Sequence, residues 1–174
     1  MHFDLKSISV QSIPEALKKV ERYRLLNEPT LAESICLDIL AIVPDHQQAL
    51  ISLLLARTDQ FPSQIPAKVA QEILAQIKGD YEQAYYAGII WERVGHVRMR
   101  QGRGGASAYH ALREAMAHYE KAIDFASPGN DDAILRWNTC ARVIMQNPDV
   151  CPLPDEDPTE SWARDEAGSR IADA

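Results

Sequence analysis

Five titratable side chains stand at spacings that would bring them to one face of a helix. They are His110, Glu114 and His118 in one segment and Glu92 and His96 in another, each four residues from the next. Residues four apart share a helix face, and imidazole with carboxylate is a common ligand set for metal ions. Three such side chains span about 12 Å over two turns, which is too far to share one ion. We therefore expect no metal and no cofactor, and a metal-binding protein or enzyme using these residues is the alternative interpretation.

A second candidate site is a group of arginines beside a glycine-rich run. Arg98, Arg100 and Arg103 lie within six residues, next to glycines in residues 102–105. Guanidinium groups bind phosphates and carboxylates, so contact with an acidic partner, a phosphate or a nucleic acid is a second alternative to a solvated loop. Three arginines without aromatics or a longer basic stripe do not predict a nucleic-acid interface, and no Gly-Lys-Ser/Thr follows to make a phosphate loop. No serine or cysteine stands in a known nucleophile motif, so we expect no enzyme and no catalytic residues.

The composition is that of an ordinary globular domain. The chain has 174 residues, of which 46% are hydrophobic and 25% charged. No apolar run approaches the roughly 18 residues of a membrane helix, so we expect no membrane contact. The three cysteines are an odd number without metal-ligand spacing, which is typical of reduced thiols. With no basic segment followed by an apolar one at the N-terminus, these features predict a cytoplasmic protein.

The acidity of the chain is concentrated near its C-terminus. The net charge is −7, and residues 149–174 hold 8 acidic and 2 basic residues, against 17 and 16 in residues 1–148. This last segment is also rich in proline, and such a composition predicts a largely disordered tail. Trp162 is its one large anchor. We expect this tail either to solubilise the protein or to fold back onto the arginine group or a neighbour's groove.

Helix signals recur along the first half of the chain. Ser12 and Glu15 have the spacing of a capping box, in which each side chain satisfies a free backbone N–H of the first turn. Similar signals follow the prolines at positions 29 and 44. They predict helices that begin near residues 13, 31 and 46. A proline-containing break over residues 61–66 separates the third of these from a further apolar stripe.

The second half predicts longer helices. The interval from Gly95 to Glu114 exceeds an ordinary turn, so we expect two extended helices that form a protruding hairpin with its tip at residues 102–105. Asn130 is placed to cap a last helix. The inner face of that helix would hold Ala133, Ile134, Trp137, Cys140, Ala141 and Ile144.

The helix pair at residues 13–46 is 34 residues long and resembles a tetratricopeptide repeat. It matches that pattern at Ala16, Tyr23, Ala32 and Pro44. A third unit matches it at Gly88, Trp91, Ala115, Tyr119 and Ala122. The second unit departs from it, because Arg57 stands where the family has an aromatic residue. The resemblance covers about residues 13–144.

The resemblance implies an all-α fold of three antiparallel helical hairpins and a closing helix in a short right-handed superhelix. The expected organisation is an N-terminal arm at residues 1–11, a repeat domain at residues 12–148 and the tail at 149–174. Within the repeat domain, we expect units at about 13–46, 47–79 and 80–128 and a closing helix at 130–146.

The resemblance also implies a function, because such repeats stack into a curved surface that holds another protein. We expect a non-catalytic adaptor, assembly factor or chaperone-like subunit that binds a peptide or helix of a partner protein. Family members that grip a C-terminal carboxylate use Lys, Asn and Arg, which are not at the matching positions here. The expected groove residues are Gln48, Ile51, Leu55, Tyr85, Tyr86, Ile89, Glu92, Leu135 and Asn138. The identity of the partner and the oligomeric state are left open.

Overall fold

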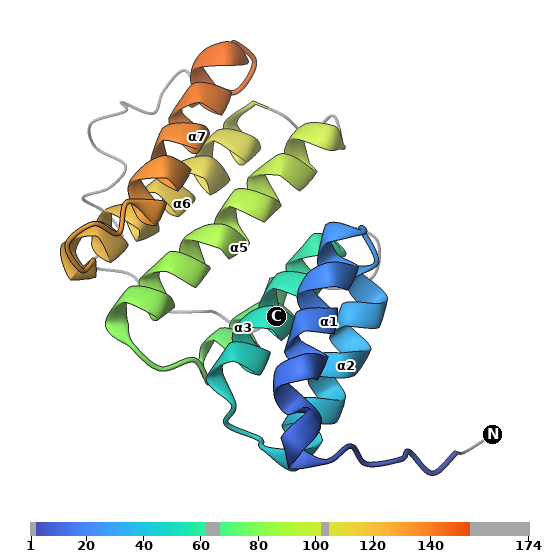
Figure 1. The fold of residues 1–174 in the computed structure, drawn as a ribbon. Helices are drawn as coiled ribbons and strands as arrows, with labels where there is room; N and C mark the ends of the chain where they lie inside the picture. Colours follow the sequence, from blue (N-terminus) through green and yellow to red (C-terminus); the bar gives the residue numbers. More distant parts are fainter. Residues whose placement is uncertain (1–2, 62–66, 102–104, 154–174) are drawn as a thin grey trace, which may run out of the picture.

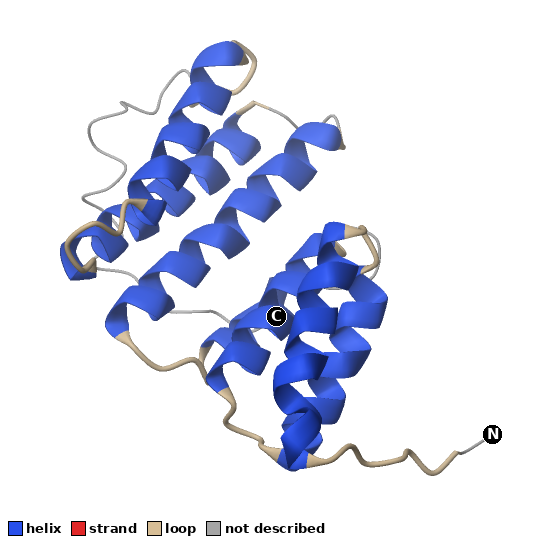
Figure 2. Cartoon of the chain, viewed as in Figure 1, coloured by secondary structure: helices blue, strands red, loops and turns tan. Residues whose placement is uncertain are grey.

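The computed structural model describes residues 3–61, 67–101 and 105–153, and in these ranges every regular element is a helix (Figure 1). Figure 2 shows helices joined by short loops, without a strand in the described residues. The predicted all-α class is confirmed. The elements are the 3-10 helix η1 (Val10–Ser12) and the α-helices α1 (Ile13–Leu25), α2 (Pro29–Ile42), α3 (Gln47–Asp59), α4 (Ala67–Leu74), α5 (Asp80–Arg100), α6 (Ala106–Phe125) and α7 (Asp132–Gln146).

The helices pack in chain order, each against the next (Figure 1). In addition, α1 contacts α3, and α3 contacts α5. Helices α1, α3 and α5 therefore form one continuous layer. Helix α2 packs against α1 and α3, and helix α4 packs against α3 and α5. Among the described residues, none of the helices combines the length and the apolarity needed to cross a membrane.

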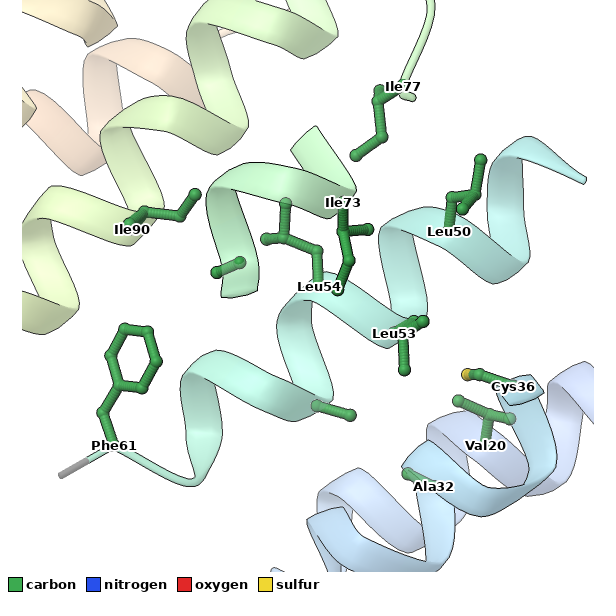
Figure 3. Packing of buried hydrophobic residues seen from close by; sticks show 12 residues of the cluster. Val20, Ala32, Cys36, Leu50, Leu53, Leu54, Phe61, Ile73, Ile77 and Ile90 are labelled. Atoms are coloured by element: carbon green, nitrogen blue, oxygen red, sulfur yellow. The ribbon is translucent and has the colours of Figure 1, made fainter. Parts of the chain in front are cut away.

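Helix α5 is the common wall of two hydrophobic cores. One core joins α1 to α4 through residues such as Val20 and Leu54 (Figure 3), and Ile90 of α5 belongs to it. The other core joins α5, α6 and α7, and the adjacent Ile89 belongs to that one. Because Ile89 and Ile90 belong to different cores, this part of α5 is enclosed from two sides. Leu55 packs against both cores and connects them.

The predicted capping box at the start of α1 is wrong. Ser12 belongs to η1 and already has helical backbone angles, so its hydroxyl donates to the carbonyl of Ser9 at 2.7 Å instead of capping α1. Glu15 pairs with Lys18 on the helix surface at 3.1 Å. The first turn is favoured instead by the proline at its second position, whose fixed φ suits a helix start.

Helices α5 and α6 approach closely because small residues line their contact. The alanines of α6 at positions 108, 111, 115 and 122 are fully buried. A Cβ atom added to Gly88 would lie 2.5 Å from Cε1 of Tyr119, and one added to Gly95 would lie 2.9 Å from Cδ2 of Leu112. These two glycines are seven residues apart and lie on one face of α5, so they set the distance between the two helices.

We expect Gly88→Ala to destabilise the protein. Overpacking a tight contact costs about 1–3 kcal/mol, which outweighs the gain of about 1 kcal/mol from replacing glycine inside a helix. Chemical denaturation of the native chain and the variant measures the difference. In a Tyr119→Leu background, the alanine should become neutral or stabilising, since the ring that it meets is gone. A more stable Gly88→Ala protein in the native background would contradict the close approach.

Candidate functional site

The predicted groove residues do not share one environment. Ile89 and Glu92 are only 3% and 4% exposed, so their assignment to a binding surface is wrong. They lie on the part of α5 that α6 and α7 cover, which a prediction from repeat position does not anticipate. Gln48 and Leu135 are exposed, and five others are half-buried: Ile51, Leu55, Tyr85, Tyr86 and Asn138.

The paired tyrosines belong to an aromatic cluster. Tyr85 stacks on Tyr81 with ring centroids 5.5 Å apart, meets Tyr86 edge-on at 5.2 Å and lies 5.8 Å from Tyr119. Burial, helped by the neighbouring Tyr85, raises the pKa of Tyr86 to about 12. Both tyrosines are thus held in place by packing, and their half-exposed edges are what a partner could contact.

Glu92 is the centre of a buried polar network. Tyr119 donates its hydroxyl hydrogen to Glu92 Oε2 at 2.6 Å, and Arg136 Nη1 donates to Oε1 at 3.2 Å. His96 Nε2 lies 3.8 Å from Oε1, too far for a hydrogen bond. Burial alone would raise the pKa of Glu92, but these neighbours outweigh it and hold the pKa below its usual value. The network joins α5, α6 and α7, so Glu92 has a structural role.

The histidine-rich faces of α5 and α6 do not form a metal centre in the described residues, where no three His, Cys, Asp or Glu side chains converge as metal ligands would. His118 lines a shallow pocket of about 330 Å³ between α4, α5 and α6, together with Lys121 and Phe125. Burial, helped by the charge of Lys121, lowers the pKa of His118. The lowered pKa favours the neutral form of the His118 imidazole, which packs between the helices.

The structure does form a charged cavity, at the end of the layer made by α1, α3 and α5. Its volume is about 510 Å³, a size at which protein cavities take small ligands or a few side chains. Helix α1 and the start of α2 form one side of it, the end of α3 another, and the second half of α5 a third. We call it the arginine cavity, and it is lined by Arg24, Asn27, Pro29, Thr58, Asp59, Phe61, Arg93 and Arg100.

Asp59 connects the three helices of this layer. Both Nε and Nη2 of Arg24 lie 2.9 Å from Asp59 Oδ2, and Arg93 Nη2 lies 2.9 Å from Oδ1. The carboxylate is largely enclosed, with 18% of its side chain exposed. Arg24, Asp59 and Arg93 come from α1, α3 and α5 and are 35 and 34 residues apart. Each oxygen of Asp59 is therefore already bound by an arginine.

A second ion pair involves Arg57, which stands where the predicted repeat pattern has an aromatic residue. Arg57 Nε donates to Glu33 Oε1 at 3.0 Å, and Gln60 Nε2 donates to Glu33 Oε2 at 2.6 Å. Arg57 thus connects α3 to α2 by binding the carboxylate of Glu33. Both members of the ion pair are mostly enclosed.

The arginines near the hairpin tip do not act as one group. Arg98 Nη1 donates to the carbonyl of Ser107 at 2.7 Å and so closes the hairpin, whereas Arg100 lines the arginine cavity. Arg103 lies outside the described residues, as does Trp162, the predicted tail anchor.

The sequence prediction included Arg100 but missed the other charged residues of the arginine cavity: Arg24, Asp59 and Arg93. One signal could have found them, because Arg24, Asp59 and Arg93 are separated by 35 and 34 residues, close to the expected length of one unit. Comparison of the chain with family models, with characterised proteins and with solved structures finds no significant match to any of them.

Proposed function

We propose that this protein is a non-catalytic, cytoplasmic binding module of tetratricopeptide-like organisation. It holds a peptide or helix of a partner protein against the face of α1, α3 and α5. The observation that carries the proposal is the contact of these three helices in sequence order, bridged by Arg24, Asp59 and Arg93 at spacings of 35 and 34 residues. Equivalent positions of stacked 34-residue repeats would meet in this way.

The chemistry of the face also supports a binding role. Ile51, Leu55 and Tyr86 are half-buried along α3 and α5, and the arginine cavity lies at one end of the layer. Interfaces typically place aromatic and apolar anchors beside polar groups that fix orientation. In this proposal α7 is the closing helix of a short right-handed superhelix, and it covers the apolar side of α6.

The proposal predicts that a partner protein contacts only the face formed by α1, α3 and α5. We would place a photo-cross-linking amino acid at Gln48, which is exposed on α3, and separately at Leu37, which is exposed on α2. Irradiation in the native cell should give a discrete adduct with one protein from position 48 and not from position 37. Equal adducts from both positions, or an adduct from position 37 alone, would place the contact elsewhere.

Cross-linking is preferable to replacing Tyr85 and Tyr86, because both are packed against the core and their removal would disturb the fold.

A further inference from the structure

The arginine cavity has an excess of positive charge. Arg24, Arg93 and Arg100 line it, and Asp59 is the one carboxylate among the described lining residues. Both oxygens of Asp59 are bound by Arg24 and Arg93. Arg100 is exposed and forms no ion pair or hydrogen bond with another described residue. The lining therefore carries a net charge of two positive units that the described residues leave unbalanced.

The free donors are arranged along one side of the cavity. Arg93 and Arg100 are seven residues apart on α5, so they project from the same helix face about 10 Å apart. Arg93 is 38% exposed and uses only Nη2 for Asp59, which leaves its other N–H groups for a ligand. Guanidinium groups bind carboxylates with two parallel hydrogen bonds. Two carboxylates along a peptide would balance the charge and match the two arginines.

We propose that the arginine cavity is a binding site for a carboxylate-rich peptide, which Arg93 and Arg100 bind. This deepens the proposed function and rests on it, since it names the chemistry of the segment that the module takes.

The chain itself contains a segment of this chemistry. Asp155, Glu156 and Asp157 follow closely on the described residues. The described chain passes close to the start of α6, because a Cβ atom at Gly105 would lie 3.4 Å from the carbonyl oxygen of Asp149, and Gly105 and Arg100 both adjoin the connection between α5 and α6. Asp155 is two residues beyond Leu153, the last described residue. An acidic segment of another protein has the same chemistry, and the experiment separates the two sources.

The test is the binding of a fluorescein-labelled peptide with the sequence of residues 154–163, followed by fluorescence anisotropy. The protein is the full chain in which D155N, E156Q, D157N and E160Q remove the competing charges. We expect saturable binding that weakens as salt is raised. Arg100→Gln should weaken the affinity about tenfold, the loss expected for one charge-assisted hydrogen-bond pair. Arg98→Gln removes the same charge from the same helix but does not touch the cavity, so it should change the affinity less than about twofold.

The outcomes separate the source of the peptide from the existence of the site. If the native chain binds the labelled peptide at least about tenfold more weakly than the neutralised chain, its own segment occupies the cavity. Equal affinities of the two chains would assign the cavity to a partner's acidic segment. Absence of binding by the neutralised chain, or equal losses from Arg98→Gln and Arg100→Gln, would overturn the proposal. The cross-linking experiment at Gln48 does not depend on this peptide. An adduct at Gln48 without peptide binding would therefore rule out the acidic-peptide site in the arginine cavity, but it would support partner binding on the face of α1, α3 and α5.

Discussion

Replacing Glu92 with leucine should lower the free energy of unfolding by about 3 kcal/mol or more, because removal of one member of a buried ion pair leaves the others uncompensated. The variant would leave the fully buried Tyr119 hydroxyl without its acceptor and Arg136 without its partner. Chemical denaturation measures the loss. Glu120→Leu is the matched control: Glu120 is an exposed carboxylate that also accepts a hydrogen bond from α7, through Trp137 Nε1 at 2.8 Å. It should cost less than about 1 kcal/mol.

The same network has a signature in the pH dependence of stability. The folded protein holds the pKa of Glu92 below its ordinary value of 4.5, since the approach of His96, the Tyr119 hydroxyl and Arg136 outweigh the effect of burial. The stability that this carboxylate contributes is therefore present above about pH 4.5 and is lost as the pH falls through its folded pKa. The native chain should lose stability between pH 5 and 3 more steeply than Glu92→Leu, as followed by urea denaturation. Parallel curves for the two proteins would show that Glu92 is not held in its charged form by these neighbours.

The helical framework could be predicted because its signals are local. The helix start predicted near residue 13 and the long interval between Gly95 and Glu114 correspond to the start of α1 and to the long helices α5 and α6. Prolines and glycines mark the turns between helices wherever the chain must leave helical geometry. Such signals specify where a helix is, but they do not specify what covers it.

The burial of Ile89 and Glu92 could not be predicted, since it depends on which helices enclose α5. Repeat position placed both residues on an open face, but α5 separates two cores and the face that carries these residues is covered by α6 and α7. Glu92 was also misread for a physical reason. A glutamate within an apolar stretch is usually exposed, and only the positions of Tyr119 and Arg136, more than 25 residues away, show that it is satisfied inside.

Three enclosed carboxylates each connect helices at a junction of the fold. Glu33 connects α2 to α3, Asp59 connects α1, α3 and α5, and Glu92 connects α5, α6 and α7, and each is bound by at least one arginine. Apolar packing between helices tolerates sliding by a turn, whereas a carboxylate bound by two donors is satisfied in one register only. We therefore infer that these residues fix how successive helix pairs are stacked. Asp59 differs from the other two because it also lines a cavity.

Asp59→Asn should separate these two roles by changing stability and binding in opposite directions. The asparagine keeps the size of the side chain but loses the charge that holds Arg24 and Arg93 together. We expect the free energy of unfolding to fall by about 2 kcal/mol, the scale of hydrogen bonds to a charged group. The cavity gains one positive charge, so the affinity of the tail-neutralised chain for the acidic peptide should rise several-fold at low salt. Denaturation and anisotropy on the same protein measure both quantities.

The control for Asp59→Asn is Asp45→Asn, which makes the same chemical change in an exposed pair with Lys78. A surface pair of this kind contributes at most about 1 kcal/mol, and Asp45 does not line the arginine cavity. It should leave both stability and peptide affinity nearly unchanged. If Asp59→Asn instead lowers the affinity together with the stability, the pairing of Arg24 with Asp59 is needed to position Arg93 for the ligand, and this positioning outweighs the added charge. If it lowers stability alone, the peptide binds beyond the reach of Asp59, close to Arg100 at the end of α5.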